Sequence, residues 1–565
     1  MSTQCDAQQQ RGVITQLLLD FETCPGVTLP FASRKPVVLP FNSFTPGVTN
    51  DQNPVETITG TRNRREPHKG FADIQPSMEL PMDSNIEGLF CKAAIGNPVS
   101  YLSGPNAMTG TPTITWSSGD YVLSAAQAYL TAEETFLIVY RDGDTIVTRS
   151  VVADAIDPTT EGAKWVDPDP ADVTDAPVLA IIAGATVLSS SSVVITNNAF
   201  VISSDVAIAV GDVILHENGA TARITAITQA WDGSTVEGTV VGTGYVDAVA
   251  DVGNEAVIIR GARFTHEFST PDTARLPSFA LVAGYLDLAV PYWDIFAGCK
   301  VNETALSIDA GGADQTVSTK NMMAESRTRV YQPYDAESHI AATPGTLSIS
   351  SGVATATSSH TNSALGDWVV YEKDGIFYRV KITTRTSATS WVVRRKDGTT
   401  PADITGAVVV AIYPDAYKAT NRAAAHFPLN KITATLNNVT GRLTSVSFDL
   451  MNNLDGDTYT FTGNGDREGF NEGFADVTGD ITARLTDTTI MNIGIDNAIV
   501  PMSLTFGASN SDDTMTWSVP STKHNENAPE VTGPGGTVYT TSFVSFGEGQ
   551  APTITATLTN EWSAY

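Results

Sequence analysis

The chain has 565 residues, a composition typical of globular proteins (42% hydrophobic) and a formal net charge of −29. That length exceeds what one hydrophobic core usually organises, so we expect two to four domains. So acidic a chain is unsuited to holding nucleic acid by its phosphates, which requires net positive surface. An acidic protein can still contact DNA that passes by it without being bound.

The cysteines and apolar segments favour a protein that is neither exported nor inserted in a membrane. The N-terminal residues lack the basic start and apolar core of a signal peptide. The apolar stretch 279–299 contains Asp287, Pro291 and Asp294, so we interpret it as two core strands and a corner. Four cysteines without CxxC spacing are typical of reduced thiols in a protein assembled in a cytoplasm: Cys5, Cys24, Cys91 and Cys299.

The first expected strand lies within residues 12–22, which include the run Leu17-Leu18-Leu19. Residues 24–60 follow as an arm with six prolines. Proline removes backbone donors and keeps the chain extended, so this arm is not expected to contain a central strand.

Residues 58–96 predict a loop, a strand and a capped helix in succession. The loop is basic, with four cations close together: Arg62, Arg64, Arg65 and Lys69. Residues 73–82 alternate and predict a half-buried strand. Its apolar positions are Ile74, Met78, Leu80 and Met82, and its polar positions are Asp73, Gln75, Ser77 and Glu79.

The helix begins at Asp83 and Ser84, whose side chains are suited to capping, and ends at Gly96. Between them the apolar residues recur at helical spacing and predict a face that packs on the sheet: Ile86, Leu89, Phe90, Ala93 and Ala94. We expect a short amphipathic helix beside a sheet whose other face is polar and acidic.

Three later segments share one pattern, a hairpin with an Asp-Gly or Asn-Gly turn followed by Asp, a β-branched residue and a last strand. The turns lie at Gly143, Gly219 and Gly375. We interpret them as three related β-barrel-like modules, at 111–183, 192–260 and 344–414, inserted into a host domain of residues 1–96, 261–343 and 415–565. Alternating strands continue to the end of the chain, which predicts a mainly β (α+β) class with one helix.

Two blocks resemble the tail tube proteins of long, non-contractile phage tails. One is the Thr-Gly turn at Thr59-Gly60, the basic loop, the strand and the helix ending Lys92-Ala93-Ala94-Ile95-Gly96. The other runs from Leu276 to Asn302. The resemblance implies a tail-tube-type β-sandwich whose copies form hexameric rings, stacked into a conduit for genome delivery.

The resemblance also implies partners and roles. The partners are further copies, a tape measure protein inside the tube, terminator and distal tail proteins at its ends, and double-stranded DNA passing through without specific binding. We expect Arg62, Arg64, Arg65 and Lys69 to contact a neighbouring subunit, although a solvated loop or phosphate contact would explain the same charges. If subunits close into a ring, the polar strand positions would line its bore: Asp73, Gln75, Ser77 and Glu79. Asp449 is a weaker candidate for the same surface. The alternative is that these side chains are simply exposed to solvent.

The sequence contains no motif that indicates an enzyme or a bound cofactor. The seven histidines show no HExxH spacing, and GxSxG and P-loop motifs are absent from the sequence. One rival is a cell-surface or virion adhesin built of repeated β modules that binds host carbohydrate or protein. A second rival is a glycosidase. That activity requires two carboxylates at one site, and the sequence does not identify such a pair.

Overall fold

The computed structural model describes residues 15–53, 68–103, 112–127, 130, 132, 135–143, 145–164, 173–183, 186–188, 193–196, 199–203, 208–216, 221–230, 232, 234–243, 256–259, 263–270, 275–310, 316–415, 419–420, 426–437, 439–440, 443–457, 459, 467–485, 488–508, 513–529, 536–547, 551–562 and 565. Strands predominate in these residues, which confirms the predicted mainly β class.

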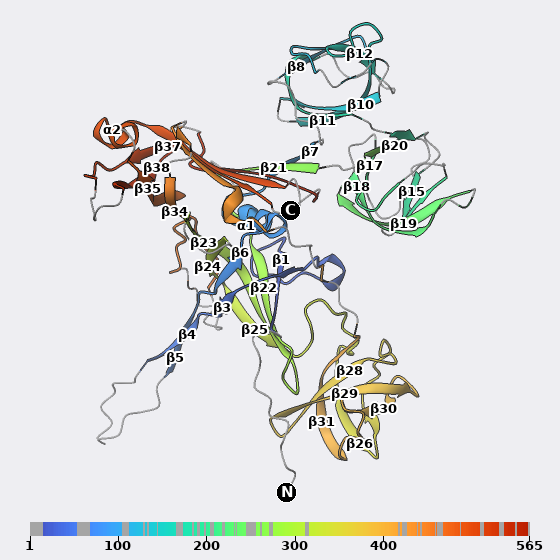
Figure 1. The fold of residues 1–565 in the computed structure, drawn as a ribbon. Coiled ribbons are helices and arrows are strands. Elements are labelled where there is room, and N and C mark those ends of the chain that lie inside the picture. Colours follow the sequence, from blue (N-terminus) through green and yellow to red (C-terminus); the bar gives the residue numbers. More distant parts are fainter. Residues whose placement is uncertain are drawn as a thin grey trace, which may run out of the picture.

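The largest sheet, the central sheet, joins strands from both ends of the chain. Its strands are β1 (Thr15–Phe21), β2 (Val37–Leu39), β3 (Ser43–Thr45), β6 (Ser77–Pro81), β7 (Val99–Ser103), β21 (Arg263–Ser269), β22 (Phe279–Tyr285), β23 (Tyr292–Asp309), β24 (Val317–Met323), β25 (Ser326–Val330), β32 (Ile432–Leu436), β33 (Val439–Thr440), β34 (Leu443–Met451), β35 (Asp476–Arg484), β36 (Val500–Gly507), β37 (Thr514–His524), β38 (Val538–Ser545) and β39 (Thr555–Asn560). A hairpin of β4 (Val48–Asn53) and β5 (His68–Ile74) projects beside it (Figure 1).

Strand β23 connects two parts of the central sheet. Its first half pairs with β22 and β25, and its second half pairs with β24 and β34. The register shifts close to Gly298, which has a φ of 65° and whose Cβ, if present, would lie 2.5 Å from the Glu325 carboxyl carbon. Glycine is therefore required where the strand passes from one set of partners to the other.

Three smaller β units lie outside the central sheet (Figure 1). Barrel A is closed and contains β8 (Thr113–Ser117), β9 (Asp120–Leu123), β10 (Thr135–Asp142), β11 (Thr145–Ala153), β12 (Glu161–Lys164) and β13 (Val173–Ala183). Sheet B is open and contains β14 (Thr186–Leu188), β15 (Val193–Thr196), β16 (Ala199–Ile202), β17 (Val213–His216), β18 (Thr221–Gln229), β19 (Val236–Thr243) and β20 (Ala256–Ile259). Barrel C is closed and contains β26 (Thr346–Ser350), β27 (Val353–Ala356), β28 (Trp368–Lys373), β29 (Ile376–Arg385), β30 (Ser390–Arg394) and β31 (Ile404–Tyr413).

The three units share one strand order. In barrel A and barrel C the third strand pairs with the fourth in a hairpin and with the sixth on its other side. Sheet B has β14 as an additional first strand, and there β17 pairs with β18 and β20 in the same way. In barrel C the hairpin turn has positive φ at both Asp374 and Gly375, as a type I′ turn requires. The loop of the sheet B hairpin, including Gly219, lies outside the described residues.

Each unit also packs against its surroundings through equivalent strands. Leu137 and Val139 of β10 and Ile182 of β13 join Val213 of β17 and Ile259 of β20 in one buried cluster with β7 and β21. In barrel C, the outward side chains of β28 and β31 form the corresponding cluster with Ala336: Trp368, Val370, Ala411 and Tyr413. Apolar contact of this kind holds the units at fixed positions on the central sheet.

Helix α1 (Ser84–Ala94) has the predicted cap, because the Asp83 carboxylate accepts a hydrogen bond of 2.8 Å from the Asn85 backbone N–H. Gly96, with a φ of 131°, follows its last turn. The helix has the expected apolar side, but its polar side is not exposed, since Ser84, Asn85 and Glu87 are buried as well. The helix is enclosed by β24 on one side and by β21, β39 and Tyr565 on the other.

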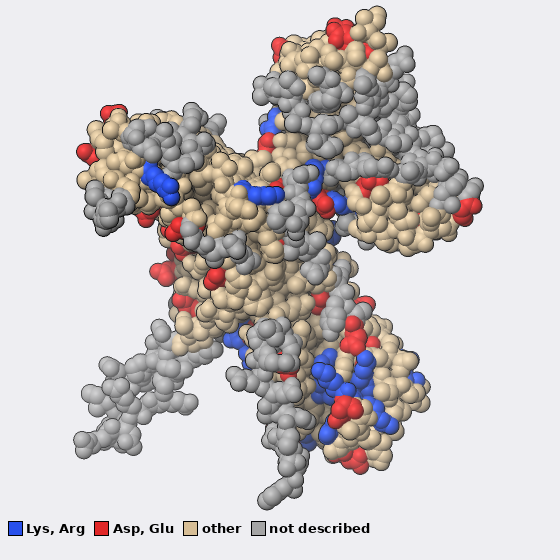
Figure 2. All heavy atoms as spheres, in the orientation of Figure 1, with Lys and Arg blue, Asp and Glu red and all other residues tan. Residues whose placement is uncertain are grey.

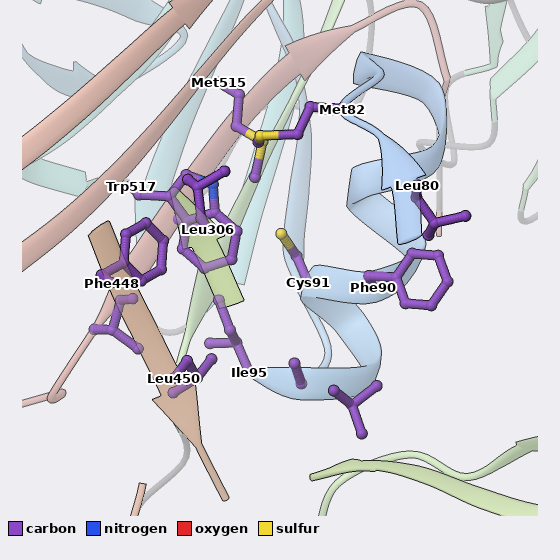
Figure 3. Packing of buried hydrophobic residues seen from close by; sticks show 14 of the residues in the cluster. Leu80, Met82, Phe90, Cys91, Ile95, Leu306, Phe448, Leu450, Met515 and Trp517 are labelled. Atoms are coloured by element: carbon purple, nitrogen blue, oxygen red, sulfur yellow. The ribbon is translucent and has the colours of Figure 1, made fainter. Parts of the chain in front are cut away.

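The main core lies between this helix and the two parts of the central sheet that β23 connects. Cys91 and Ile95 point from α1 toward Leu306 and Leu450 (Figure 3). Phe448 and Trp517 pack with ring centroids 5.4 Å apart. The apolar helix residues predicted to pack on the sheet are all buried in this cluster: Ile86, Leu89, Phe90, Ala93 and Ala94.

Two expectations about local structure are corrected, and one is confirmed. The single strand over 73–82 is interrupted at Gln75 and Pro76 and forms the end of β5 and all of β6. The proline-rich arm contains β2, β3 and β4, but among the described strands each of them pairs on one side only, so the expectation that the arm holds no central strand is confirmed. A second helix, α2 (Thr489–Ile495), packs through Ile490 and Ile493, in addition to the short 3-10 turns Phe31–Ser33 and Leu429–Lys431.

Candidate functional site

The outward side of β6, β24, β23 and β34 forms a continuous polar surface. Residues directly opposite one another across these strands are Glu79 and Thr319, Thr319 and Ala305, and Ala305 and Asp449. Glu79 and Asp449 therefore occupy one cross-strand row, three strand spacings or about 14 Å apart. The intervening inward residues, such as Met78, Leu80, Phe448 and Leu450, are buried in the core.

Further carboxylates lie on the same side of the sheet. Glu303 is opposite Met451 and Asn321, and its Oε2 accepts a hydrogen bond of 2.7 Å from Asn321 Nδ2. We call the outward carboxylates of β6, β23, β34 and β35 the acidic sheet face: Glu79, Glu303, Asp309, Asp449, Asp476 and Asp480.

Few cations oppose this charge. We compared the described residues at outward positions of β6, β24, β34, β35 and the second half of β23. One of them is a cation, Arg484, at the end of β35. Lys320 of β24 points to the opposite side, where its Nζ lies 3.0 Å from Glu87 Oε2. Burial, together with the charges of Glu303 and Asp480, raises the pKa of Asp449, as expected where like charges share a surface.

Ser77 and Glu79 lie on this surface as the alternation predicted, but Asp73 and Gln75 precede the break at Pro76. Asp73 accepts a hydrogen bond of 3.0 Å from Gln75 Nε2 and forms an ion pair with Arg467. Its charge is therefore partly compensated.

The basic loop is only partly described. Arg62, Arg64 and Arg65 lie outside the described residues, and the backbone of Lys69 lies in β5 opposite Gln52. The described strands β4 and β5 project from the central sheet (Figure 1). The contact of the basic loop with a neighbouring subunit stays a prediction.

Sequence reasoning missed four members of the acidic sheet face: Glu303, Asp309, Asp476 and Asp480. Alternation over β35 was a usable signal, because Asp476, Thr478 and Asp480 interleave with Val477 and Ile481. Glu303 and Asp309 had a shorter signal, because only the second half of β23 alternates, with Ser307 and Asp309 exposed beside the buried Leu306 and Ile308.

Metal binding and membrane spanning can both be judged for the described residues. In the part of the chain that the structure describes, no three His, Cys, Asp or Glu side chains are grouped so that they could hold a metal ion. A search of the described helices finds none with the length and apolar character needed to span a membrane.

Comparison with protein families matches residues 383–545 to the phage tail tube protein family. The matched segment begins within β29 of barrel C and ends with β38, so it includes β34 and β35 of the acidic sheet face. It covers less than a third of the chain and does not include the two blocks, 58–96 and 276–302, that suggested the same family. No curated protein matches the chain. Over residues 383–545 the chain is similar to phage tail tube proteins, and this similarity supports a structural role in a phage tail.

Proposed function

We propose that the chain is the subunit of a bacteriophage tail tube, in which hexameric rings stack into a hollow conduit with the acidic sheet face lining the lumen. The family match over 383–545 supports the tube, and the common row of Glu79 and Asp449 supports the acidic lumen.

An acidic lumen suits genome passage. DNA phosphates are bound through cations, whose contacts release condensed counterions and hold the duplex. Carboxylates instead repel the phosphates, and the repulsion is screened beyond about 8–10 Å at physiological salt. Thr319, Thr478 and Ser447 lie between the carboxylates on the same side of the sheet, so the surface is hydrated without being cationic.

Ring closure would use a strand edge. In the described part of the chain, β3 pairs with β6 on one side and has no strand partner on the other. A strand from a neighbouring copy at that edge would extend the acidic sheet face around an annulus and would remove an exposed edge. The hairpin β4–β5, with the basic loop at its tip, would then contact the adjacent ring, and tape measure, terminator and distal tail proteins would meet the tube inside and at its ends.

Negative-stain electron microscopy and sedimentation velocity of the purified chain test the proposal. The expected result is rings or tubes with a central hole. A matched pair of variants checks the edge: Phe44→Pro in β3 should abolish assembly, whereas Val194→Pro in β15, a short strand at the edge of sheet B, should not. A wild-type chain that stays monomeric under all conditions would contradict the proposal and favour an adhesin.

A further inference from the structure

The three β units share a strand order but differ in charge. Residues 344–414 carry seven Lys and Arg against five Asp and Glu, whereas 111–183 carry three against twelve and 192–260 carry two against eight. Figure 2 shows the same division: Lys and Arg gather on the lobe of barrel C, and Asp and Glu mark the lobes of barrel A and sheet B. Because the fold is shared, the charge difference is a property of the surfaces.

The cations of barrel C lie on the outside of β29 and β30 and in the turn after β30. Lys381 and Arg394 are opposite each other across the two strands, and Arg385, Arg395 and Lys396 are exposed. We call these five residues the basic barrel surface. Lys381 also forms an ion pair with Asp415, which leaves the exposed arginines and Lys396 as its most accessible charges.

Barrel A presents the opposite charge on neighbouring strands. Asp120 of β9 and Glu161 of β12 are exposed, at positions two residues apart along the paired strands. Asp157, in the loop before β12, is exposed beside them. These three residues form the acidic barrel surface.

The two surfaces cannot meet within one copy. Barrel A and sheet B lie at one end of the molecule and barrel C lies at the other, with the central sheet between them (Figure 1). The buried clusters around Leu137 and around Trp368 fix each unit to the central sheet. Rigid units of opposite charge at opposite ends are suited to head-to-tail contact between copies.

We propose that the basic barrel surface of one copy binds the acidic barrel surface of the next copy along the stack. This inference rests on the proposed tube, because stacking brings one end of a copy to the other end of its neighbour. Such a contact would set the rotational register between rings from the outside of the tube, in addition to contacts near the lumen. A free anionic polymer is the weaker partner for barrel C, because the chain as a whole, with a net charge of −29, repels it.

Zero-length crosslinking between isotopically distinct full-length copies tests the contact. A carbodiimide joins lysine to carboxylate only where the two are in contact. The expected products join Lys396 or Lys381 of one copy to Asp120, Asp157 or Glu161 of another, and 1 M salt should suppress them. Such crosslinks without rings would support this inference and contradict the proposed function. Rings that lack these crosslinks would contradict this inference alone, and a chain that does not associate at all contradicts both.

Charge reversal supplies the matched controls. Arg395→Glu with Lys396→Glu on barrel C, and separately Asp120→Lys with Glu161→Lys on barrel A, should each lower copy-to-copy association on the order of tenfold. Combining the two pairs should restore association, which a merely misfolded barrel would not do. Unchanged association in both single-surface variants would overturn the proposal. That result is also the one expected if barrel C binds an anionic polymer instead of another copy.

Discussion

Glu87 of α1 and Lys320 of β24 form an ion pair with an Oε2–Nζ distance of 3.0 Å, and both side chains are only 1% exposed. Ser318 donates a further hydrogen bond of 2.7 Å to Glu87 Oε1. The pair lies directly behind the acidic sheet face, because Thr319, between Ser318 and Lys320, is opposite Glu79. It therefore fixes the helix to the strand that carries the outward carboxylates.

Removing one member of this pair should strongly destabilise the central sheet. Lys320→Met leaves the Glu87 carboxylate buried without its cation, and we expect a loss of about 3–5 kcal/mol in the free energy of unfolding. The double variant Glu87→Gln with Lys320→Met should lose less, because no charge remains buried. Urea unfolding followed by tryptophan fluorescence measures both, and a Lys320→Met chain as stable as wild type would show that the pair contributes little.

Gly88 of α1 should not tolerate the substitution that usually stabilises a helix. A Cβ at this position would lie 2.3–2.6 Å from ring atoms of Tyr565, whose hydroxyl donates to the Ser84 backbone oxygen at 3.0 Å. Gly88→Ala gains about 1 kcal/mol of helix propensity but must displace the ring, so we expect a lower melting temperature. With Tyr565→Ala as well, the alanine should become stabilising relative to Tyr565→Ala alone. A Gly88→Ala chain that melts above wild type would contradict the packing described.

The free energy of unfolding should fall as pH rises from about 4.5 to about 7 because of Glu325. Burial and the neighbouring Glu22 raise the pKa of Glu325 from 4.5 to about 7. A carboxyl whose pKa is higher in the folded state favours folding when protonated, so this contribution is complete below about pH 4.5 and is lost as pH rises through about 7. We expect a change of about 1–3 kcal/mol after screening by solvent.

The test is the pH dependence of the unfolding free energy in wild type and in Glu325→Gln. The glutamine variant should lack the decline between about pH 4.5 and 7. Glu337→Gln, at a side chain that is 59% exposed, serves as the control and should keep it. Identical pH profiles for wild type and Glu325→Gln would exclude Glu325 as the source.

Cations in the lumen should retain DNA. Tubes of Glu79→Lys with Asp449→Lys should bind double-stranded DNA with an affinity that falls steeply with salt, since new phosphate contacts release counterions. Tubes of Glu337→Lys, with one added cation away from the acidic sheet face, should bind no more than wild type. Nuclease protection of DNA loaded into the tubes measures retention, and equal protection in both variants would place Glu79 and Asp449 elsewhere.

Local chemistry accounts for the parts of the fold that the sequence could predict. Alternation gave the inward positions Met78 and Leu80, Asp83 and Gly96 delimited α1, and the Asp374-Gly375 turn marked a hairpin. The short helix α2 could not be predicted in this way. It contains isoleucines and Gly494 and lacks a side-chain cap, so tertiary packing of Ile490 and Ile493 stabilises it instead.

Long-range pairing accounts for what the sequence could not predict. Nothing near Glu303 or Asp449 in the sequence indicates that β23 and β34 are neighbours, yet that pairing creates the acidic sheet face. The buried polar side of α1 was missed for the same reason, because Lys320 and Tyr565, which enclose Glu87 and Gly88, are far away in the sequence. Only part of the candidate site, Ser77, Glu79 and Asp449, was therefore identified.

A side-chain-resolution cryo-electron microscopy reconstruction of the assembled chain tests the central claim most directly. The account predicts a closed ring in which the Glu79 and Asp449 side chains from every copy project into the central hole, with β3 paired to a neighbouring copy. A ring with these carboxylates on its outer surface, or an assembly without a hole, would contradict it.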